Sequence, residues 1–266
     1  MRTDPNVTAA ETAKGTVARV LELLEFIARS DDEFGIKDLA QALSLPQSTV
    51  HRLLSLLIDS GFAVRSESRR YRIGPQFLRM ARVALDGNDF IAAALGPMQA
   101  LADVCGETCL LGAYHKHSQT MSFVARVDST QALRYHVRMN SVETLAWGAS
   151  GRSILAFLSD SDLRAVLAQD DHSPSSGKRL IPSELKADLA EIRDRGYARS
   201  KSQRIEGAIG ISAPVFDPGN MVLGSLSVTI PELRFKAKDE ACYIAALLQQ
   251  SRELSIALGH SKAAVG

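Results

Sequence analysis

The chain has 266 residues, 45% of them hydrophobic, and its 31 basic and 30 acidic residues leave a formal net charge of +1. This length suits two domains of ordinary size, and the apolar content is enough for a core in each. No apolar run approaches the roughly 20 residues of a membrane span, and the polar N-terminus lacks the apolar segment of a signal peptide. Three cysteines without framework spacing suit a reducing compartment. We therefore expect a cytoplasmic protein that makes no membrane contact.

The N-terminal part of the chain begins with a polar stretch and a long helix. Residues 1–14 are expected to form a flexible arm. Apolar residues at helical spacing predict a helix from Thr16 to Arg29. Residues 30–35 form an acidic loop, which should face away from any polyanionic partner of this region.

The stretch from Ile36 to Gly74 predicts two helices, a tight turn between them and a hairpin after them. Apolar residues recur at helical spacing from Ile36 to Leu43 and from Val50 to Ile58, on either side of the turn at 44–46. Apolar and basic residues alternate from 62 to 73, as in a hairpin with one basic face. This is the layout of a winged helix-turn-helix.

The same stretch concentrates positive charge. From Pro46 to Arg82 it carries seven arginines against two acids, a local excess of +5 in a nearly neutral chain. A basic patch on this motif is typical of duplex DNA binding, although helical hairpins also occur in bundles without a nucleic-acid role. We expect base readout by the second helix and backbone contacts by the hairpin, through Gln47, Ser48, Thr49, His51, Arg52, Arg65, Arg69, Arg70 and Arg72.

The rest of the chain predicts helices and strands in a mixed order. Residues 75–85 should form a helix that links two domains, and a further helix follows from Phe90 to Cys105, with a kink or fresh start at Pro97. Alternating patterns then predict strands at 108–114, 121–127, 133–137, 197–200, 209–216 and 222–230. Helical patterns lie at 149–158, 160–168, 182–195 and 236–258. Strands flanked by helices indicate an α+β domain with an antiparallel sheet.

Six motifs, in order along the chain, carry a resemblance to a known family. They are VARVLELL (17–24), SLPQSTVHRLL (44–54), RYRIGP (70–75), ASGRSILA (149–156), RDRGYA (193–198) and ISAPVFD (211–217). From about Gly15 to Gly259 the sequence resembles the IclR family of bacterial transcriptional regulators. Two departures stand out. Ser44 replaces the usual glycine of the turn, and Ser200 and Gln203 lie where the family frequently has acidic residues.

The resemblance implies an α+β chain in five parts. These are an N-terminal arm (1–14), a winged helix-turn-helix (15–74), a linker helix (75–88), a GAF-like effector-binding domain with an antiparallel sheet (89–260) and a tail (261–266). It also implies homodimers or dimers of dimers on palindromic, double-stranded promoter DNA. Because Ser44 is not glycine, a left-handed conformation there would cost of order 1 kcal/mol.

Carried over by position, the resemblance also implies an effector pocket. Its lining would be Ala149, Ser150, Ser200, Ala208, Gly210, Ser227 and Thr229. Ser227 and Thr229 are two apart on a predicted strand and therefore face the same side. A helix that begins near Ser150 would offer backbone N–H groups to a carboxylate. Hydroxyls beside a helix end suit a small organic acid, aromatic acids included.

No motif in the sequence indicates catalysis, a cofactor or a metal. Ser150 lies in G-A-S-G rather than the G-x-S-x-G elbow, and no phosphate-binding glycine motif is present. His115, His117 and Cys109 lack a further ligand pair. Two other functions stay open. One is an enzyme acting on a small acid, with a basic helical accessory domain. The other is a protein-interaction module whose sensor domain binds no metabolite.

Overall fold

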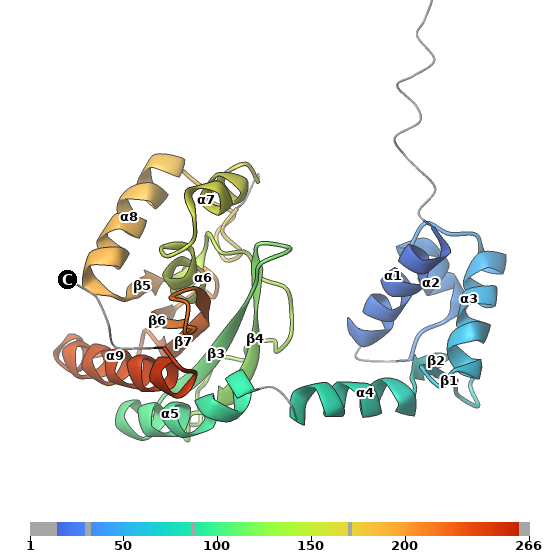
Figure 1. Cartoon of the computed structure of the whole chain (residues 1–266), viewed down its shortest axis with the longest axis horizontal. Coiled ribbons are helices and arrows are strands. Elements are labelled where there is room, and N and C mark those ends of the chain that lie inside the picture. The colour runs from blue at the N-terminus through green and yellow to red at the C-terminus, as the bar shows by residue number, and fades with distance from the viewer. Residues whose placement is uncertain (1–14, 30–32, 87–88, 170–171, 261–266) are drawn as a thin grey trace, which may run out of the picture. The chain divides into compact units, whose positions relative to one another are not determined.

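The structure is a computed structural model that describes residues 15–29, 33–86, 89–169 and 172–260 (Figure 1). The chain divides into two compact units, with the boundary in the sequence between Gly87 and Asn88. Each unit has a hydrophobic core of its own. None of the helices within the described ranges combines the length and apolarity that crossing a bilayer requires. The expected arm and tail lie outside the described residues.

The first unit is a winged helix-turn-helix. Its elements are α1 (Thr16–Arg29), α2 (Ile36–Ala42), α3 (Gln47–Asp59), β1 (Ala63–Arg65), β2 (Tyr71–Ile73) and α4 (Pro75–Asp86). The predicted apolar stripes form its core, in which Leu23, Leu39 and Leu53 are fully buried. Ser44 adopts the left-handed conformation that the turn requires, with φ of 52°. The helix-turn-helix and hairpin predicted from periodicity are therefore confirmed.

The hairpin is tied to the helices at two places. Phe34, which the sequence placed in an acidic loop, is buried and exchanges two backbone hydrogen bonds with Tyr71 at 3.0 and 2.8 Å. At the other end, Gly74 donates to the Phe62 carbonyl at 2.8 Å. A Cβ on Gly74 would lie 2.2 Å from the Gly61 carbonyl oxygen, so only glycine fits there. These contacts thus fix the distance between the wing and the C-terminal end of α3.

The second unit is a five-stranded antiparallel sheet between helices. Its strands are β3 (Thr108–His115), β4 (Thr120–Val127), β5 (Ala198–Lys201), β6 (Ala208–Phe216) and β7 (Val222–Pro231), in the order β4-β3-β7-β6-β5. Its helices are α5 (Asp89–Cys105), α6 (Gly148–Leu155), α7 (Asp160–Leu167), α8 (Pro182–Arg195) and α9 (Glu240–Ala257). A short 3₁₀ turn (Ala237–Asp239) precedes α9. The predicted α+β class is confirmed.

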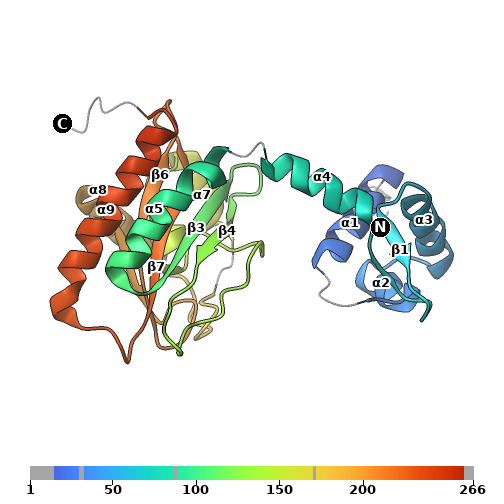
Figure 2. The same ribbon diagram turned by 90° about the horizontal axis from the view of Figure 1, so that it is seen from below.

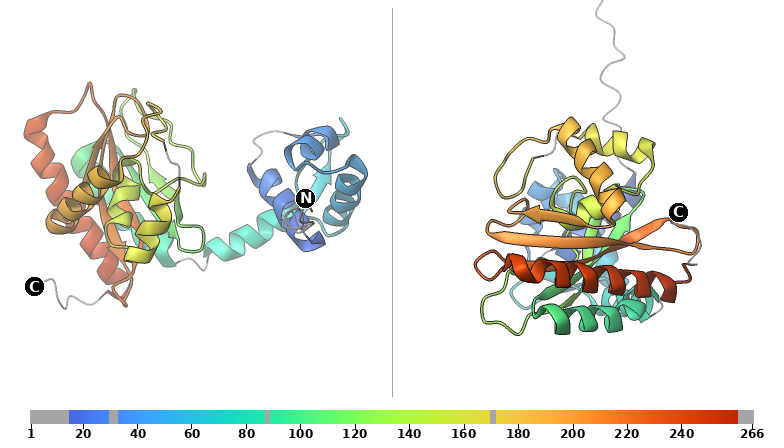
Figure 3. Two further views of the ribbon diagram at one scale, coloured as in Figure 1. Left: turned by 90° about the horizontal axis from the view of Figure 1, so that it is seen from above. Right: turned by 90° about the vertical axis from the view of Figure 1, so that its left-hand side faces the viewer.

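Two layers of helices cover the sheet. Figure 2 shows α5 and α9 side by side on one face, and the right-hand view of Figure 3 shows α6, α7 and α8 on the other. The core against α5 and α9 includes Leu111, Val228 and Leu247. The core on the opposite side includes Leu110 and Ile154. Helix α5 runs through Pro97.

Some predicted elements differ from the structure, among them the helix expected from residue 236, which begins as an α-helix only at Glu240. The strand expected at 133–137 is wrong, because these residues form no strand. The 128–147 segment is joined to β4 by a bridge between Met121 and Glu143 and by a hydrogen bond from the Asn140 N–H to the Phe123 carbonyl at 2.9 Å. The apolar alternation there has another cause, since Val137 packs into the core. Helix α6 ends at Leu155 rather than at residue 158.

Candidate functional site

The first unit presents the polar face of α3 to solvent. Val50, Leu53, Leu54 and Leu57 are buried on the inner face of this helix. The expected base-reading residues lie on the outer face, where Thr49 is half-buried and the others are exposed, namely Gln47, Ser48, His51 and Arg52. Because they share one face of a helix whose other face is anchored, they can enter a major groove together.

The four wing arginines have different surroundings. The Arg65 guanidinium lies 5.9 Å from the centre of the Tyr71 ring. Arg70 donates to the Glu33 carbonyl from Nε at 3.0 Å and from Nη2 at 2.5 Å, and lies 3.6 Å from the Asp38 carboxylate. Arg69 and Arg72 are exposed. Arg70 therefore holds the wing to the helices, a role that the sequence did not predict. The exposed side chains of Arg69 and Arg72 have no such contact with the helices within the described residues.

The Glu33 carboxylate is a second tie to the wing. Its Oε2 accepts hydrogen bonds from the Ser66 and Ser68 hydroxyls, each at 2.9 Å. These bonds, followed by the charges of Arg72 and Arg70, lower the pKa of Glu33 below its usual range. The charged carboxylate is therefore the form that holds the wing.

We expect this tie to weaken in acid. Because the pKa of Glu33 is lowered in the folded state, its stabilisation is present above the unfolded pKa and is lost as pH falls through the folded value. The protection of the amides at residues 66–70, measured as exchange relative to the intrinsic rate at each pH, should therefore fall below about pH 4. The Glu33→Gln variant should exchange fast at neutral pH already. Glu67→Gln, which removes an exposed charge from the same turn, is the control, and equal acceleration in both variants would contradict this role for Glu33.

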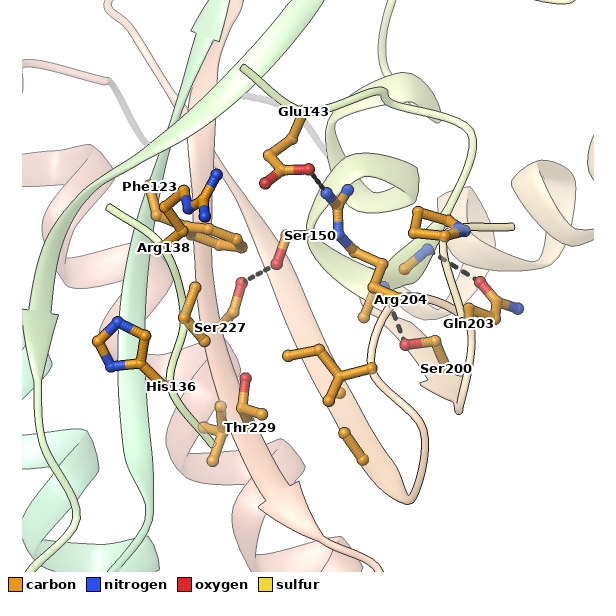
Figure 4. Close-up of a pocket in the computed structure, with 18 residues that line it drawn as sticks. Phe123, His136, Arg138, Glu143, Ser150, Ser200, Gln203, Arg204, Ser227 and Thr229 are labelled. Atoms are coloured by element: carbon orange, nitrogen blue, oxygen red, sulfur yellow. Dashed lines mark hydrogen bonds and ion pairs between the residues drawn. The ribbon is translucent and has the colours of Figure 1, made fainter. Parts of the chain in front are cut away.

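The second unit contains a cavity of about 230 Å³ between α6, the central strands and the 128–147 segment (Figure 4). All seven residues of the expected effector pocket line it, namely Ala149, Ser150, Ser200, Ala208, Gly210, Ser227 and Thr229. They come from four elements, α6, β5, β6 and β7, which the sheet order brings together. The structure thus places these residues around one cavity large enough for a small organic molecule.

Buried serines connect the cavity wall to the sheet. The Ser150 and Ser227 hydroxyls are 2.7 Å apart, and Ser227 is 2.8 Å from the Ser212 hydroxyl. Ser212 in turn lies 2.9 Å from Ser153 on α6. This chain of hydroxyls orients Ser150 and Ser227 at the cavity surface.

The N-terminus of α6 is capped by protein side chains. The Ala149 N–H donates to the Ser200 hydroxyl at 3.0 Å, and the Gly148 N–H donates to the Gln203 side-chain oxygen at 2.9 Å. Ser200 and Gln203, like Ser44, are positions at which the sequence departs from the family pattern. The expected carboxylate cradle is wrong at these two N–H groups, because they already have acceptors.

Several residues in the lining were not predicted. They are Phe123, His136, Arg138, Glu143, Gln203 and Arg204. Arg204 forms an ion pair with Glu143, and their side chains are only 16% and 26% exposed. Burial lowers the pKa of Arg204 to about 10, so the guanidinium is charged at neutral pH. Glu143 is 61 residues away in sequence, and no periodicity signals such a pair.

The residues considered for a metal have other contacts. His115 Nε2 lies 2.8 Å from the Ser122 hydroxyl, and Cys109 is fully buried. Burial raises the pKa of the Cys109 thiol above its ordinary range. Among residues 15–29, 33–86, 89–169 and 172–260, no three His, Cys, Asp or Glu side chains are grouped to hold a metal ion.

A winged helix-turn-helix on one unit and a hydroxyl-lined cavity in another define a DNA-binding transcriptional regulator with an effector domain. Family models agree with this class. The IclR helix-turn-helix domain matches residues 16–67, and the C-terminal domain of bacterial IclR transcriptional regulators matches residues 82–256.

Individual relatives span nearly the whole chain. The transcriptional regulator KdgR of Escherichia coli is 28% identical over 92% of this chain and 93% of its own. The crystal structure of an IclR transcriptional regulator from Silicibacter has a TM-score of 0.82 at 28% identity, covering 93% of this chain and 97% of that one. An IclR homolog from Microbacterium hydrocarbonoxydans, crystallised with 4-hydroxybenzoate, shares the fold with a TM-score of 0.80 at 22% identity, covering 93% and 100%. The chain belongs to the IclR family of bacterial transcriptional regulators.

Proposed function

We propose that the chain is a cytoplasmic, non-enzymatic regulator that binds palindromic promoter DNA. When a small organic acid enters the second unit, the protein dissociates from the DNA or changes its arrangement on it. The observation that carries this proposal is the pairing of an exposed polar face on α3 with a cavity walled by hydroxyls in a separate unit. Two copies would place their α3 helices in successive major grooves about 34 Å apart.

Apolar side chains on the first unit support a homodimer. On α1, Val17 is 74% exposed and Leu21 is 56% exposed. On α4, Leu78, Met80 and Val83 are also exposed. A second copy of the chain that packs against these helices would remove these apolar side chains from water. A dimer, or a pair of dimers, would then read a two-fold symmetric site.

The cavity supports a small acid as effector. The bound 4-hydroxybenzoate of the Microbacterium relative is an organic acid with a hydroxyl group. The serine and threonine hydroxyls of this cavity can hydrogen-bond such groups. To act as a switch, the effector must bind two arrangements of the assembly with different affinities.

A gel-shift of the purified protein on its own upstream DNA, across a salt series, tests this function. A discrete band that survives competitor DNA and moves when an organic acid is added is the expected result. Binding that is steeply salt-dependent and indifferent to sequence would contradict specific regulation. Turnover of a small acid without DNA affinity would favour the enzyme instead.

Replacing Arg52 by alanine should weaken specific DNA binding by about 5- to 150-fold, because one bidentate base contact contributes about 1–3 kcal/mol of discrimination. The Arg52 side chain is exposed, so the melting temperature should not change. Gel-shift titration and a thermal melt measure the two quantities. Arg252→Ala, at an exposed position on α9, is the matched control and should leave both unchanged. An equal loss of thermal stability in Arg52→Ala would count against a reading role.

A further inference from the structure

We propose that Arg138 binds the acid group of the effector at the edge of the cavity, and that the effector's uncharged polar end faces Ser150, Ser227 and Thr229. This inference rests on the proposed function and specifies the orientation of the ligand in the cavity. It assigns charge recognition to the 128–147 segment, rather than to the α6 N-terminus or to Arg204.

Arg204 is unsuited to hold a ligand carboxylate, because both of its terminal nitrogens already have protein partners. Nη2 is paired with Glu143, and Nη1 lies 3.3 Å from both the Thr144 and Trp147 carbonyl oxygens. Glu143 is also fixed, since its carboxylate accepts from Ser141 at 2.8 Å and its backbone bridges Met121. An entering acid would have to break this partly buried ion pair to reach the guanidinium, which is costly.

The inner wall of the cavity is neutral. The Gly148 and Ala149 N–H groups donate to Gln203 and Ser200, and Ser150 and Ser227 bond to each other. These hydroxyls can still accept or donate one further hydrogen bond, which suits a hydroxyl or carbonyl group of a ligand. An unpaired carboxylate there would lose its hydration without gaining a charge partner.

Arg138 differs from Arg204 in both its exposure and its partners. It lines the cavity and is exposed, and among the described residues no carboxylate lies within ion-pair distance of it. Figure 4 shows Arg138 and His136 on one side of the cavity and Arg204, Gln203 and Ser200 on the other, with Ser150 and Ser227 between them. Of the two arginines in the lining, Arg138 is therefore the one whose charge is available to a ligand.

The segment that carries Arg138 is anchored on both sides of it. Arg234 donates to the Leu133 carbonyl at 2.8 Å and to both oxygens of the buried Glu107 carboxylate at 2.6 and 2.5 Å. Beyond Arg138, the Asn140 N–H donates to the Phe123 carbonyl at 2.9 Å. A cation on a fixed backbone loses less freedom on binding than one on a free loop. The effector class is thus an organic anion whose neutral polar group lies opposite its carboxylate.

Calorimetric titration of the full chain tests this assignment. The probes are benzoate, 4-hydroxybenzoate, pyruvate and succinate, each beside its neutral amide. For any acid that binds the wild type, Arg138→Gln should raise the dissociation constant about tenfold or more, as expected for loss of a charge-assisted hydrogen bond. Arg138→Lys should recover part of the affinity, and the amides should bind both proteins equally. Arg134→Gln, at an exposed position on the same segment outside the cavity, is the matched control.

Three outcomes would overturn the proposal in distinguishable ways. Acid binding that is unchanged in Arg138→Gln removes Arg138 and leaves the acid-sensing function intact. An equal loss of acid and amide affinity indicates a packing role for this side chain. No binding by any acid, while specific DNA binding persists, removes the assignment together with these four acids as effectors. A thermal melt of each variant checks that it is folded.

Discussion

Replacing Arg204 by methionine should lower the free energy of unfolding of the second unit by about 3 kcal/mol, because it leaves the partly buried Glu143 carboxylate without its cation. The substitution also removes the guanidinium that bonds the Thr144 and Trp147 carbonyls at the start of α6. Trp147 is the only tryptophan of the chain and is buried beside this site. Its fluorescence during urea denaturation therefore reports on this unit alone.

The double variant Arg204→Met with Glu143→Met separates charge from packing. Removing both members of a buried pair is usually far less costly than removing one, so the double variant should recover much of the lost stability. A double variant as unstable as Arg204→Met would show that the contacts to the carbonyls, and not the stranded carboxylate, account for the loss. DNA binding should survive in both variants at temperatures where the second unit is folded.

Local patterns in the sequence were sufficient for most of the fold. Helices α1 and α8 have the bounds that their apolar spacing predicts, since capping and periodicity depend on neighbouring residues only. The turn at Ser44 was predictable for the same reason. The segment 133–137 was not, because its alternation reflects one residue buried under a cavity rather than a strand paired at the sheet edge.

In the functional sites, too, some residues were predictable from the sequence and others were not. The exposed face of α3 follows from helical spacing, and the serines of the cavity were located through family motifs. The pairs Arg204–Glu143, Arg70–Glu33 and Arg234–Glu107 were missed, since each joins residues far apart in the chain. Such pairs arise from strand order and loop packing, and no local pattern records them. They decide which arginines are available to a ligand or to DNA.

Replacing Gly74 by alanine should destabilise the first unit by more than about 3 kcal/mol, beyond the usual range for overpacking. The added Cβ would lie 2.2 Å from the Gly61 carbonyl oxygen, 2.7 Å from the Phe62 carbonyl carbon and 2.8 Å from the Ala63 nitrogen. All three are backbone atoms, so no side chain can rotate away. The wing must move from the end of α3, and we expect specific DNA binding to fall at least tenfold in a gel-shift titration.

The cause is steric, because Gly74 is not among the residues with positive φ. Gly15→Ala is the matched control, since a Cβ there has no atom within 4 Å and both stability and DNA binding should be retained. Hydrogen exchange at the β1 and β2 amides locates the damage, because a displaced wing exposes them while the core of α2 and α3 stays protected. If Gly74→Ala bound DNA as wild type with unchanged exchange, the fixed separation of wing and α3 would not be what positions this protein on its operator.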